Sequence, residues 1–350
     1  MRGISNDILR NLVPVQIIGT QRSGSNLLRV MLNQLHGVFA PHPPHILKTF
    51  DPIVQFYGDL DDIDNYNDLA SDICKFVERN PVPWLNSRFD PELILKYSKE
   101  RSLLEAYLAI HEVNASANKA KFWFNKSMQN VYFIEYFEKN GFKPYYIHLI
   151  RDGRDVALSF RKAIVGEKHM YHLAQQWRED QELSNYYVEK FGSTRAIRVK
   201  YEDLLHQPQE EIKRICRFIG LEYSNNILKF YESQDSKITA ESGEMWHNLS
   251  RPLMKNNFNK YKKELRQEDV EIFEKVAGKL LDEYGYKLEN HLNKKPFKFS
   301  PDQIKDFDAV NLSLKHAILK TAEKKDLRKR HEQEQLIKQI YIQKGVLKAT

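Results

Sequence analysis

The chain has 350 residues, of which 41% are hydrophobic, and two of them are cysteines. This hydrophobic content is enough for a sizeable core, so a chain that is disordered throughout is excluded. The formal net charge is +7 and it sits at one end, because residues 294–350 hold fourteen Lys or Arg against seven Asp or Glu while the rest of the chain is neutral.

Cysteine placement and the lack of long apolar runs restrict the class of protein further. Cys74 and Cys216 each lie in an apolar helical stretch, so we expect reduced core thiols rather than a disulfide framework or a cysteine metal site. No charged and apolar leader precedes Val15, and no apolar run approaches the roughly 18 residues that span a bilayer. The sequence therefore predicts a cytoplasmic protein without a transmembrane segment.

Residues 15–35, which read VQIIGTQRSGSNLLRVMLNQL, predict a strand, a tight loop and a helix, because a short apolar run is followed by apolar residues at helical spacing. Between the two elements, Gly19 and Gly24 can adopt backbone angles that are closed to other residues, so the loop can turn its N–H groups inward. The N-terminus of the following helix adds partial positive charge. We therefore expect this loop to bind an anion.

The spacing of these two glycines matches a phosphate-binding P-loop. A nucleotide triphosphatase needs Lys followed by Ser or Thr after the second glycine, whereas Ser25 and Asn26 follow Gly24 here, and Arg22 is the loop's only cation. Such a loop is poorly equipped to hydrolyse ATP, but it can hold a nucleotide 5'-phosphate whose leaving oxygen needs a fixed charge. The alternative is a glycine-rich turn without a ligand.

A second candidate segment is the loop FAPHPPHI at residues 39–46, in which three prolines forbid a regular helix and hold His42 and His45 on a stiff loop. We expect this loop near the ligand-binding edge of a sheet. One of the two histidines is a candidate general base near neutral pH. The alternative is a surface loop whose histidines only form hydrogen bonds.

The middle of the chain adds two further units in which a strand is followed by basic residues and a helix. After a helical insertion over about 51–120, residues 121–127 predict a strand that ends at Lys126, and residues 145–150 predict another that ends in the turn RDGRD. Arg151 in this turn and Ser159 two helical turns later can face one anion. The alternatives are a solvated lysine and an exposed salt-bridge turn, but two such units suggest a ligand with two phosphates.

Residues 195–205 predict a fourth strand, which runs into Tyr201, and the polar segment 238–264 could close over a ligand. Residues 291–350 predict a basic helical C-terminal extension. Within it, Ser300 and Gln303 form a predicted capping box at which a helix begins. A solvated helical surface is the default interpretation of this extension, and peripheral contact with an acidic glycan or a membrane is the alternative. No nucleic-acid-binding signature accompanies the charge, so we expect no nucleic-acid partner.

Taken together, these motifs resemble the sulfotransferases that use 3'-phosphoadenosine 5'-phosphosulfate (PAPS). GTQRSGSNLLR resembles the family's 5'-phosphosulfate loop, IRDGRDVALSF resembles its 3'-phosphate motif, and VKYEDLL resembles the strand end that follows. The motif style is similar to the branch that contains the protein-tyrosine sulfotransferases. The resemblance covers roughly residues 14–290 and implies a three-layer α/β/α domain over residues 1–290, P-loop-NTPase-like, with a central parallel sheet of about five strands.

The resemblance also implies roles for the motif residues. Arg151 and Ser159 would bind the 3'-phosphate, Tyr201 would lie by the adenine, and Lys126 would steady the transferring sulfuryl group. The 5'-phosphosulfate would be held by Arg22 with Ser23, Gly24, Ser25 and Asn26. A weaker match implies a late cofactor-closing segment with Ser250, Arg251 and Lys255.

The catalytic base is where the sequence departs from that branch, which has a glutamate about twenty residues after the loop arginine. The corresponding stretch here is APHPPHI, without a carboxylate. His42 lies closest in position and His45 is its neighbour, so we expect a histidine base.

The implied reaction moves a sulfuryl group from PAPS to an acceptor hydroxyl on a carbohydrate, a lipid-linked compound or a small metabolite, and it leaves 3',5'-bisphosphoadenosine. It needs no metal, because fixed cations neutralise the charge.

Two other hypotheses compete with this sulfotransferase interpretation. A P-loop kinase or nucleotide hydrolase predicts a Lys-Ser/Thr pair after Gly24, which is absent. A binding scaffold would depend on the basic C-terminal region and not on Arg22.

Overall fold

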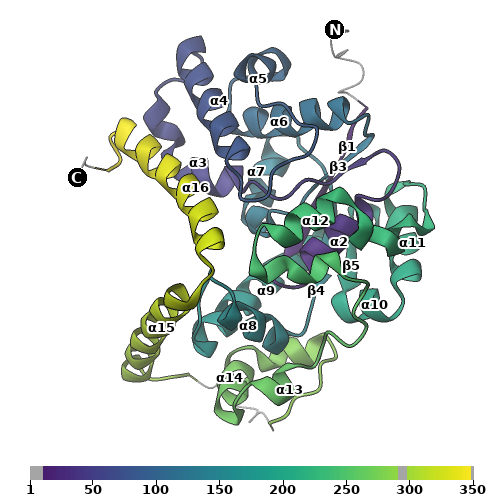
Figure 1. The fold of residues 1–350 in the computed structure, drawn as a ribbon, viewed down its shortest axis with the longest axis vertical. Helices are drawn as coiled ribbons and strands as arrows, with labels where there is room; N and C mark the ends of the chain where they lie inside the picture. The colour runs from purple at the N-terminus through teal and green to yellow at the C-terminus, as the bar shows by residue number, and fades with distance from the viewer. Residues whose placement is uncertain (1–10, 291–297, 348–350) are drawn as a thin grey trace.

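The structure is a computed structural model that describes residues 11–290 and 298–347. Its centre is a five-stranded sheet with the order β2-β3-β1-β4-β5, in which every neighbouring pair is parallel (Figure 1). The strands are β1 (Val13–Gly19), β2 (Val38–Phe39), β3 (Phe122–Asn125), β4 (Tyr145–Ile150) and β5 (Ala196–Lys200). The predicted parallel sheet of about five strands is confirmed.

Strand β1 lies in the middle of the sheet because both of its faces are apolar enough to be covered. Residues 15–18 are fully buried, as is typical of a parallel strand between two helical layers. Val15 and Ile17 pack on one side with the helix that follows the strand, and Ile18 packs on the other side. Its neighbours are β3 and β4, so the loops after these three strands meet at one edge of the sheet.

Helices cover both faces of the sheet, as the three-layer prediction requires. One face packs against α2 (Ser25–Leu32), α11 (Pro208–Ile219), the 3-10 helix η3 (Asn225–Glu232) and α12 (Gln234–Glu241). The other face packs against α6 (Leu103–Ala117), η2 (Met128–Phe133), α7 (Ile134–Lys139) and α9 (Met170–Arg195). The helix predicted after the strand at 121–127 is thus a 3-10 turn followed by an α-helix.

The predicted insertion over about 51–120 is helical throughout its core. It consists of η1 (Asp51–Tyr57), α4 (Ile63–Glu78), α5 (Pro91–Tyr97) and α6, and α3 (Ile46–Phe50) precedes it. These helices form one hydrophobic cluster that also includes Trp123 of β3. The insertion is therefore fused to the sheet by a shared core rather than attached by a hinge.

The helices that follow the motif turns begin earlier in the chain than the sequence predicts. α8 (Gly153–Lys162) begins inside the RDGRD turn, because Asp152 caps it by accepting a hydrogen bond from Arg154 N at 3.0 Å. Tyr201, expected at a strand end, instead begins α10 (Tyr201–His206). The next elements are η4 (Glu244–Ser250), α13 (Tyr261–Glu264) and α14 (Gln267–Glu283).

The C-terminal region consists of two helices, α15 (Pro301–Thr321) and α16 (Lys324–Gln343), which run along one side of the molecule in yellow in Figure 1. The capping box predicted at Ser300 and Gln303 is confirmed by reciprocal hydrogen bonds of 3.2 and 2.9 Å. The boundary predicted at residues 290 and 291 falls at 291–297, which lie outside the described residues. In the described part of the chain, no helix has the length and apolar character that crossing a bilayer requires.

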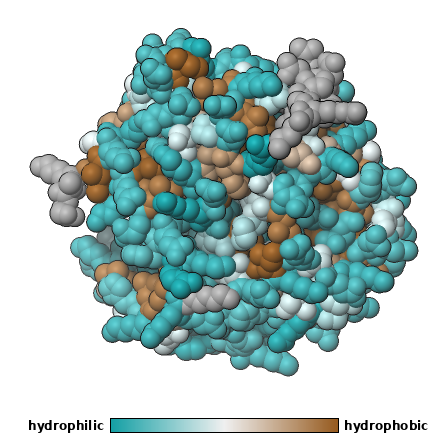
Figure 2. All heavy atoms as spheres, turned by 45° about the horizontal axis from the view of Figure 1, so that its top comes forward, coloured by the Kyte–Doolittle hydropathy of each residue, from teal (hydrophilic) through white to brown (hydrophobic). Residues whose placement is uncertain are grey.

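Polar and charged side chains cover most of the face in Figure 2, and the apolar residues visible there form small separate groups. Many large aromatic residues are buried, and Trp123 and Trp177 are fully enclosed. Burial of this apolar surface is the main stabilising term of the fold. Cys74 and Cys216 are buried free thiols, as expected.

Because two histidines are fully buried, we predict that the free energy of unfolding depends on pH. His111 contacts the Tyr107 carbonyl and His148 contacts Gln181 Oε1, each at 2.7 Å, and burial lowers the pKa of each imidazole from 6.5 to about 4. Between pH 6.5 and about pH 4, the unfolded chain binds more protons than the folded chain, so the free energy of unfolding falls as the pH falls. The expected loss is about 1.4 kcal/mol per pH unit for each histidine.

Urea unfolding at pH 7 and at pH 5 measures this dependence. The midpoint should be lower at pH 5, and His148→Asn should make the difference smaller. His36→Asn is the matched control, because His36 is exposed and should leave the difference unchanged. Equal midpoints at the two pH values for the wild-type protein would contradict the prediction.

Candidate active site

The loop between β1 and α2 has the strained backbone that its glycines predict. Gly24 has φ 88° and the preceding Arg22 has φ 71°, both in the left-handed region. A Cβ atom on Gly24 would lie 2.2 Å from the ring of Tyr201, so only glycine lets the loop approach that ring. Ser25 and Asn26 line a cavity at the start of α2, whereas Ser23 is buried and does not line it.

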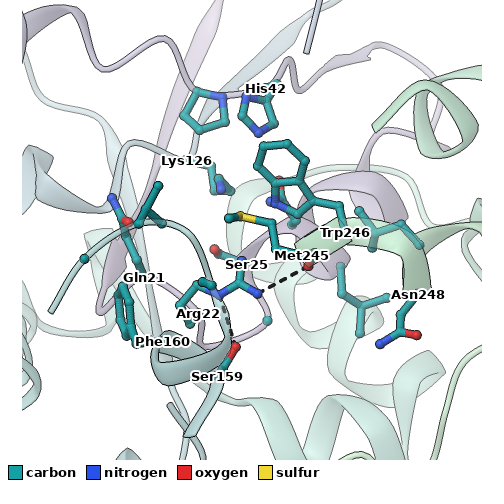
Figure 3. A pocket seen from close by; sticks show the side chains of 18 of the residues that line it. Gln21, Arg22, Ser25, His42, Lys126, Ser159, Phe160, Met245, Trp246 and Asn248 are labelled. Atoms are coloured by element: carbon teal, nitrogen blue, oxygen red, sulfur yellow. Dashed lines mark hydrogen bonds between the residues drawn. The ribbon is translucent and has the colours of Figure 1, made fainter. Parts of the chain in front are cut away.

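Arg22 joins the loop to α8 and η4. Its Nε donates to Ser159 Oγ at 3.1 Å and its Nη2 donates to the Met245 carbonyl at 3.2 Å (Figure 3). Burial, together with the charges of Arg151 and Arg330, lowers the pKa of Arg22 to about 10. The loop after β1 and the helix that follows the RDGRD turn therefore meet directly through Arg22 and Ser159.

Arg151 follows β4 and lies on the opposite side of the loop backbone. It donates to the Arg22 carbonyl at 3.0 Å and to the Asn257 carbonyl at 3.2 Å, and its guanidinium lies 4.4 Å from the centre of the Tyr201 ring. Asn257 in turn donates to the Tyr201 hydroxyl at 2.7 Å. Arg151 also forms a long ion pair of 3.9 Å with Asp155, so its closer contacts are the two backbone carbonyls and the aromatic face.

Lys126 follows β3 and is 8% exposed. Among the described residues, no hydrogen bond or ion pair to its ammonium group is found. Burial, followed by the charges of Arg29 and Arg22, holds the pKa of Lys126 well below its usual range. A buried cation beside two arginines is favourable only when an anion enters the same space.

The loop that carries His42 and His45 is held rigidly at the same edge. Trp84 Nε1 donates to the His42 carbonyl at 2.7 Å and Asn80 Nδ2 donates to the Pro43 carbonyl at 3.1 Å. Neither ring nitrogen of His42 has a hydrogen-bond partner among the described residues, and the ring lies edge-on to Trp246 with 4.9 Å between the ring centres (Figure 3).

Both histidines of this loop are held neutral. Burial, then the charges of Lys126 and Arg29, keeps the pKa of His42 well below its usual range. Burial, then Lys126 and Lys48, lowers the pKa of His45 to about 3. A neutral imidazole with free nitrogens can accept a proton, and an anion beside Lys126 would raise its basicity by offsetting the cations that lower the pKa.

These residues surround one cavity of about 770 Å³. Of the residues predicted for the site, those that line it are Arg22, Gly24, Ser25, Asn26, His42, His45, Lys126, Arg151, Ser159 and Tyr201. The volume is in the range of pockets for small ligands. Several cations with few carboxylates suit a ligand with more than one anionic group.

The segment predicted to close over the cofactor contributes to the cavity wall, but with other residues than expected. Ser250, Arg251 and Lys255 are exposed and do not line the cavity, and Ser250 Oγ donates to the His247 carbonyl at 2.9 Å. The short helix η4 instead directs Met245 and Trp246 inward. The approach of this segment to the cavity is as predicted, but the charged side chains point elsewhere.

Two arginines of the site were missed by sequence reasoning. Arg29 is fully buried, forms a 2.7 Å ion pair with Asp235 and donates to the Ala40 carbonyl at 2.8 Å, so it fixes the histidine loop to α2 and α12. An arginine inside the apolar stripe of α2 was a signal for this role. Arg330, on the C-terminal helix α16, lines the cavity, and nothing in the local sequence indicates that position.

Comparisons with known proteins agree with this geometry. The profile of the sulfotransferase family matches residues 14–225, and no curated protein gives a significant match. The sulfotransferase domain of the Synechococcus PCC 7002 olefin synthase superposes with a TM-score of 0.51 and 20% identity, covering 79% of this chain and 96% of that one. A sulfotransferase domain from the curacin biosynthetic pathway gives 0.53 and 18%, with 79% and 99% covered.

The two structural likenesses support the fold, and the family match extends over more than half of the chain, from β1 through both basic motifs. The chain therefore belongs to the sulfotransferase family.

Proposed function

We propose that this sulfotransferase moves a sulfuryl group from PAPS to a hydroxyl oxygen of an acceptor. The observation that carries this proposal is the convergence of Arg22, Lys126 and Arg151 on one cavity, with Lys126 lacking a counter-ion among the described residues. Two of these cations follow β3 and β4 on either side of β1, so the sheet itself sets the distance between two anion-binding positions.

The residues around the loop would hold the two ends of the nucleotide. Arg151 and Ser159 would bind the 3'-phosphate, and the loop backbone with Arg22, Ser25 and Asn26 would bind the 5'-phosphosulfate. Tyr201 lies between the loop glycine and Arg151, where its ring limits the position of the adenosine. Charge-assisted hydrogen bonds of this kind are the strong ones in such sites.

In the transfer step, His42 accepts the hydroxyl proton while the acceptor oxygen forms a bond to sulfur. The bond between sulfur and the bridging oxygen of the 5'-phosphate breaks, and the electron pair stays on that phosphate. Lys126 and Arg22 stabilise the negative charge that develops on the sulfuryl and bridging oxygens. The sulfuryl group needs no metal in this scheme, because these fixed cations carry out the neutralisation.

Calorimetric binding of 3',5'-bisphosphoadenosine, compared with magnesium ATP, tests the proposal. We expect tight binding of the bisphosphate and weak binding of magnesium ATP, because Ser25 and Asn26 replace the P-loop Lys-Ser/Thr pair. A preference for magnesium ATP would overturn the proposal in favour of a P-loop kinase. Loss of binding in a chain that lacks residues 294–350, together with unchanged binding in Arg22→Ala, would favour the binding scaffold instead. The proposal requires that Arg22→Ala weakens binding.

A further inference from the structure

The C-terminal helix α16 is docked against the cavity by specific contacts. Lys329 Nζ donates to the Pro81 carbonyl at 3.4 Å and to Ser242 Oγ at 3.2 Å, and Gln333 Nε2 donates to the Phe76 carbonyl at 3.2 Å. Leu336 and Ile340 of the same helix are buried in the core of the helical insertion. Helix α16 thus bridges the insertion on one side and the segment around η4 on the other.

This docking places Arg330 in the wall of the cavity, together with Gln333 and Ile337. The Arg330 guanidinium lies 5.5 Å from the centre of the Trp246 ring, and its Nη2 is 3.7 Å from Met245 Sδ. Among the described residues, no carboxylate lies within ion-pair distance of this guanidinium, and its buried Nε has no hydrogen-bond partner. Asp326 and Glu334, on the same helix, only partly offset the lowering of its pKa by burial.

Arg330 lies on the side of the cavity that holds the proposed base. Trp246 contacts both Arg330 and His42, and the positive charge of Arg330 contributes to the lowered pKa of His42 and of His45. Arg330 also approaches Arg22, because both contact Met245. Arg151 and Ser159, proposed for the 3'-phosphate, instead contact the loop, Tyr201 and the segment around Asn257. The guanidinium is therefore available to a group that enters beside His42, where the acceptor must lie.

We propose that Arg330 is a specificity-determining residue that binds an anionic group, a carboxylate or a phosphate, on the hydroxyl acceptor. The planar guanidinium presents its N–H groups as a fork, so it can bind such a group through two parallel hydrogen bonds, which a neutral acceptor cannot form. A helix of the basic C-terminal region would then select the substrate, because its positive charge at position 330 lines the cavity. This inference rests on the proposed function, because it assumes that the acceptor enters beside His42.

Binding of matched probes to the protein saturated with 3',5'-bisphosphoadenosine tests this inference. The probes are methyl glucuronide against methyl glucoside for the carboxylate and glucose 6-phosphate against glucose for the phosphate, each measured by calorimetry. We expect the anionic member of at least one pair to bind about tenfold more tightly than its neutral partner. In Arg330→Ala this preference should disappear, and Arg330→Lys should restore part of it.

Arg328→Ala is the matched control, because it removes the same charge from the same helix at a side chain that is 75% exposed and 3.9 Å from Glu332. It should leave the preference unchanged. Equal or undetectable binding within both pairs in the wild-type protein, or an equal loss in Arg328→Ala, would overturn the inference. Arg330→Ala should also bind 3',5'-bisphosphoadenosine as tightly as the wild type does. Weaker binding would mean that Arg330 contacts the nucleotide and would overturn the inference. Failure of the wild type to bind this nucleotide would contradict the proposed function instead.

Discussion

Replacing Arg151 with alanine is expected to weaken the binding of 3',5'-bisphosphoadenosine by about 100-fold, as measured by calorimetry. The substitution removes a buried cation whose nearest carboxylate is 3.9 Å away, and with it a 3.0 Å hydrogen bond to the Arg22 carbonyl. The 3'-phosphate would lose its main cation and the loop would lose a support, so both effects act in the same direction.

Two variants separate these effects. Arg151→Lys keeps the positive charge but cannot hold the Arg22 and Asn257 carbonyls together, so we expect an intermediate affinity. Arg161→Ala removes an arginine from α8, the helix that follows Arg151. Arg161 pairs with Asp269 at 2.7 Å and does not line the cavity, so the affinity of this variant should equal that of the wild type. Unchanged affinity in Arg151→Ala would refute the assignment of the 3'-phosphate site.

Replacing His42 with alanine is expected to lower the rate of sulfuryl transfer by about 1,000-fold while leaving nucleotide affinity intact. His42 has no hydrogen-bond partner among the described residues for either ring nitrogen and is neutral, so its loss removes a proton acceptor and no structural contact of the nucleotide site. Transfer from radiolabelled PAPS to an acceptor found by screening measures the rate, and calorimetry measures the affinity.

His45→Ala is the comparison that decides between the two histidines of the loop. Both ring nitrogens of His42 lack a hydrogen-bond partner among the described residues, whereas for His45 this holds for Nδ1, and His45 has a left-handed φ of 57° at the start of α3. We expect His45→Ala to retain most of the activity. Full activity in His42→Ala, with loss in His45→Ala, would show that the base is assigned to the wrong residue.

Much of the fold follows from local patterns in the sequence. β1, β3 and β4 were predicted because each is a short apolar run that ends in a glycine or a charged residue, and the capping box at Ser300 was predicted because its signal is local. β2 has only two residues, which is too few for a periodic pattern, so its pairing with β3 could not be foreseen.

Part of the candidate site could also be predicted from local sequence patterns, and part of it could not. Arg22, Lys126 and Arg151 each follow a strand, and parallel strands bring their carboxyl ends together, so their meeting in one cavity could be predicted. The direction of side chains in the irregular segment around η4 could not, which is why Trp246 and not Arg251 faces the cavity. Arg330 reaches the cavity through the tertiary docking of α16, which no neighbouring residue encodes.

The docking of α16 has a consequence for how the protein matures during synthesis. The hydrogen bonds that seat this helix join residues 248 and 257 positions apart, Lys329 with Pro81 and Gln333 with Phe76. A chain emerging from the ribosome can form the sheet and its loop long before these partners are available, and contacts of such separation form slowly. The nascent protein would therefore complete the proposed nucleotide site first and the proposed acceptor pocket only after residue 340 has been released, so that nucleotide binding would precede acceptor selectivity.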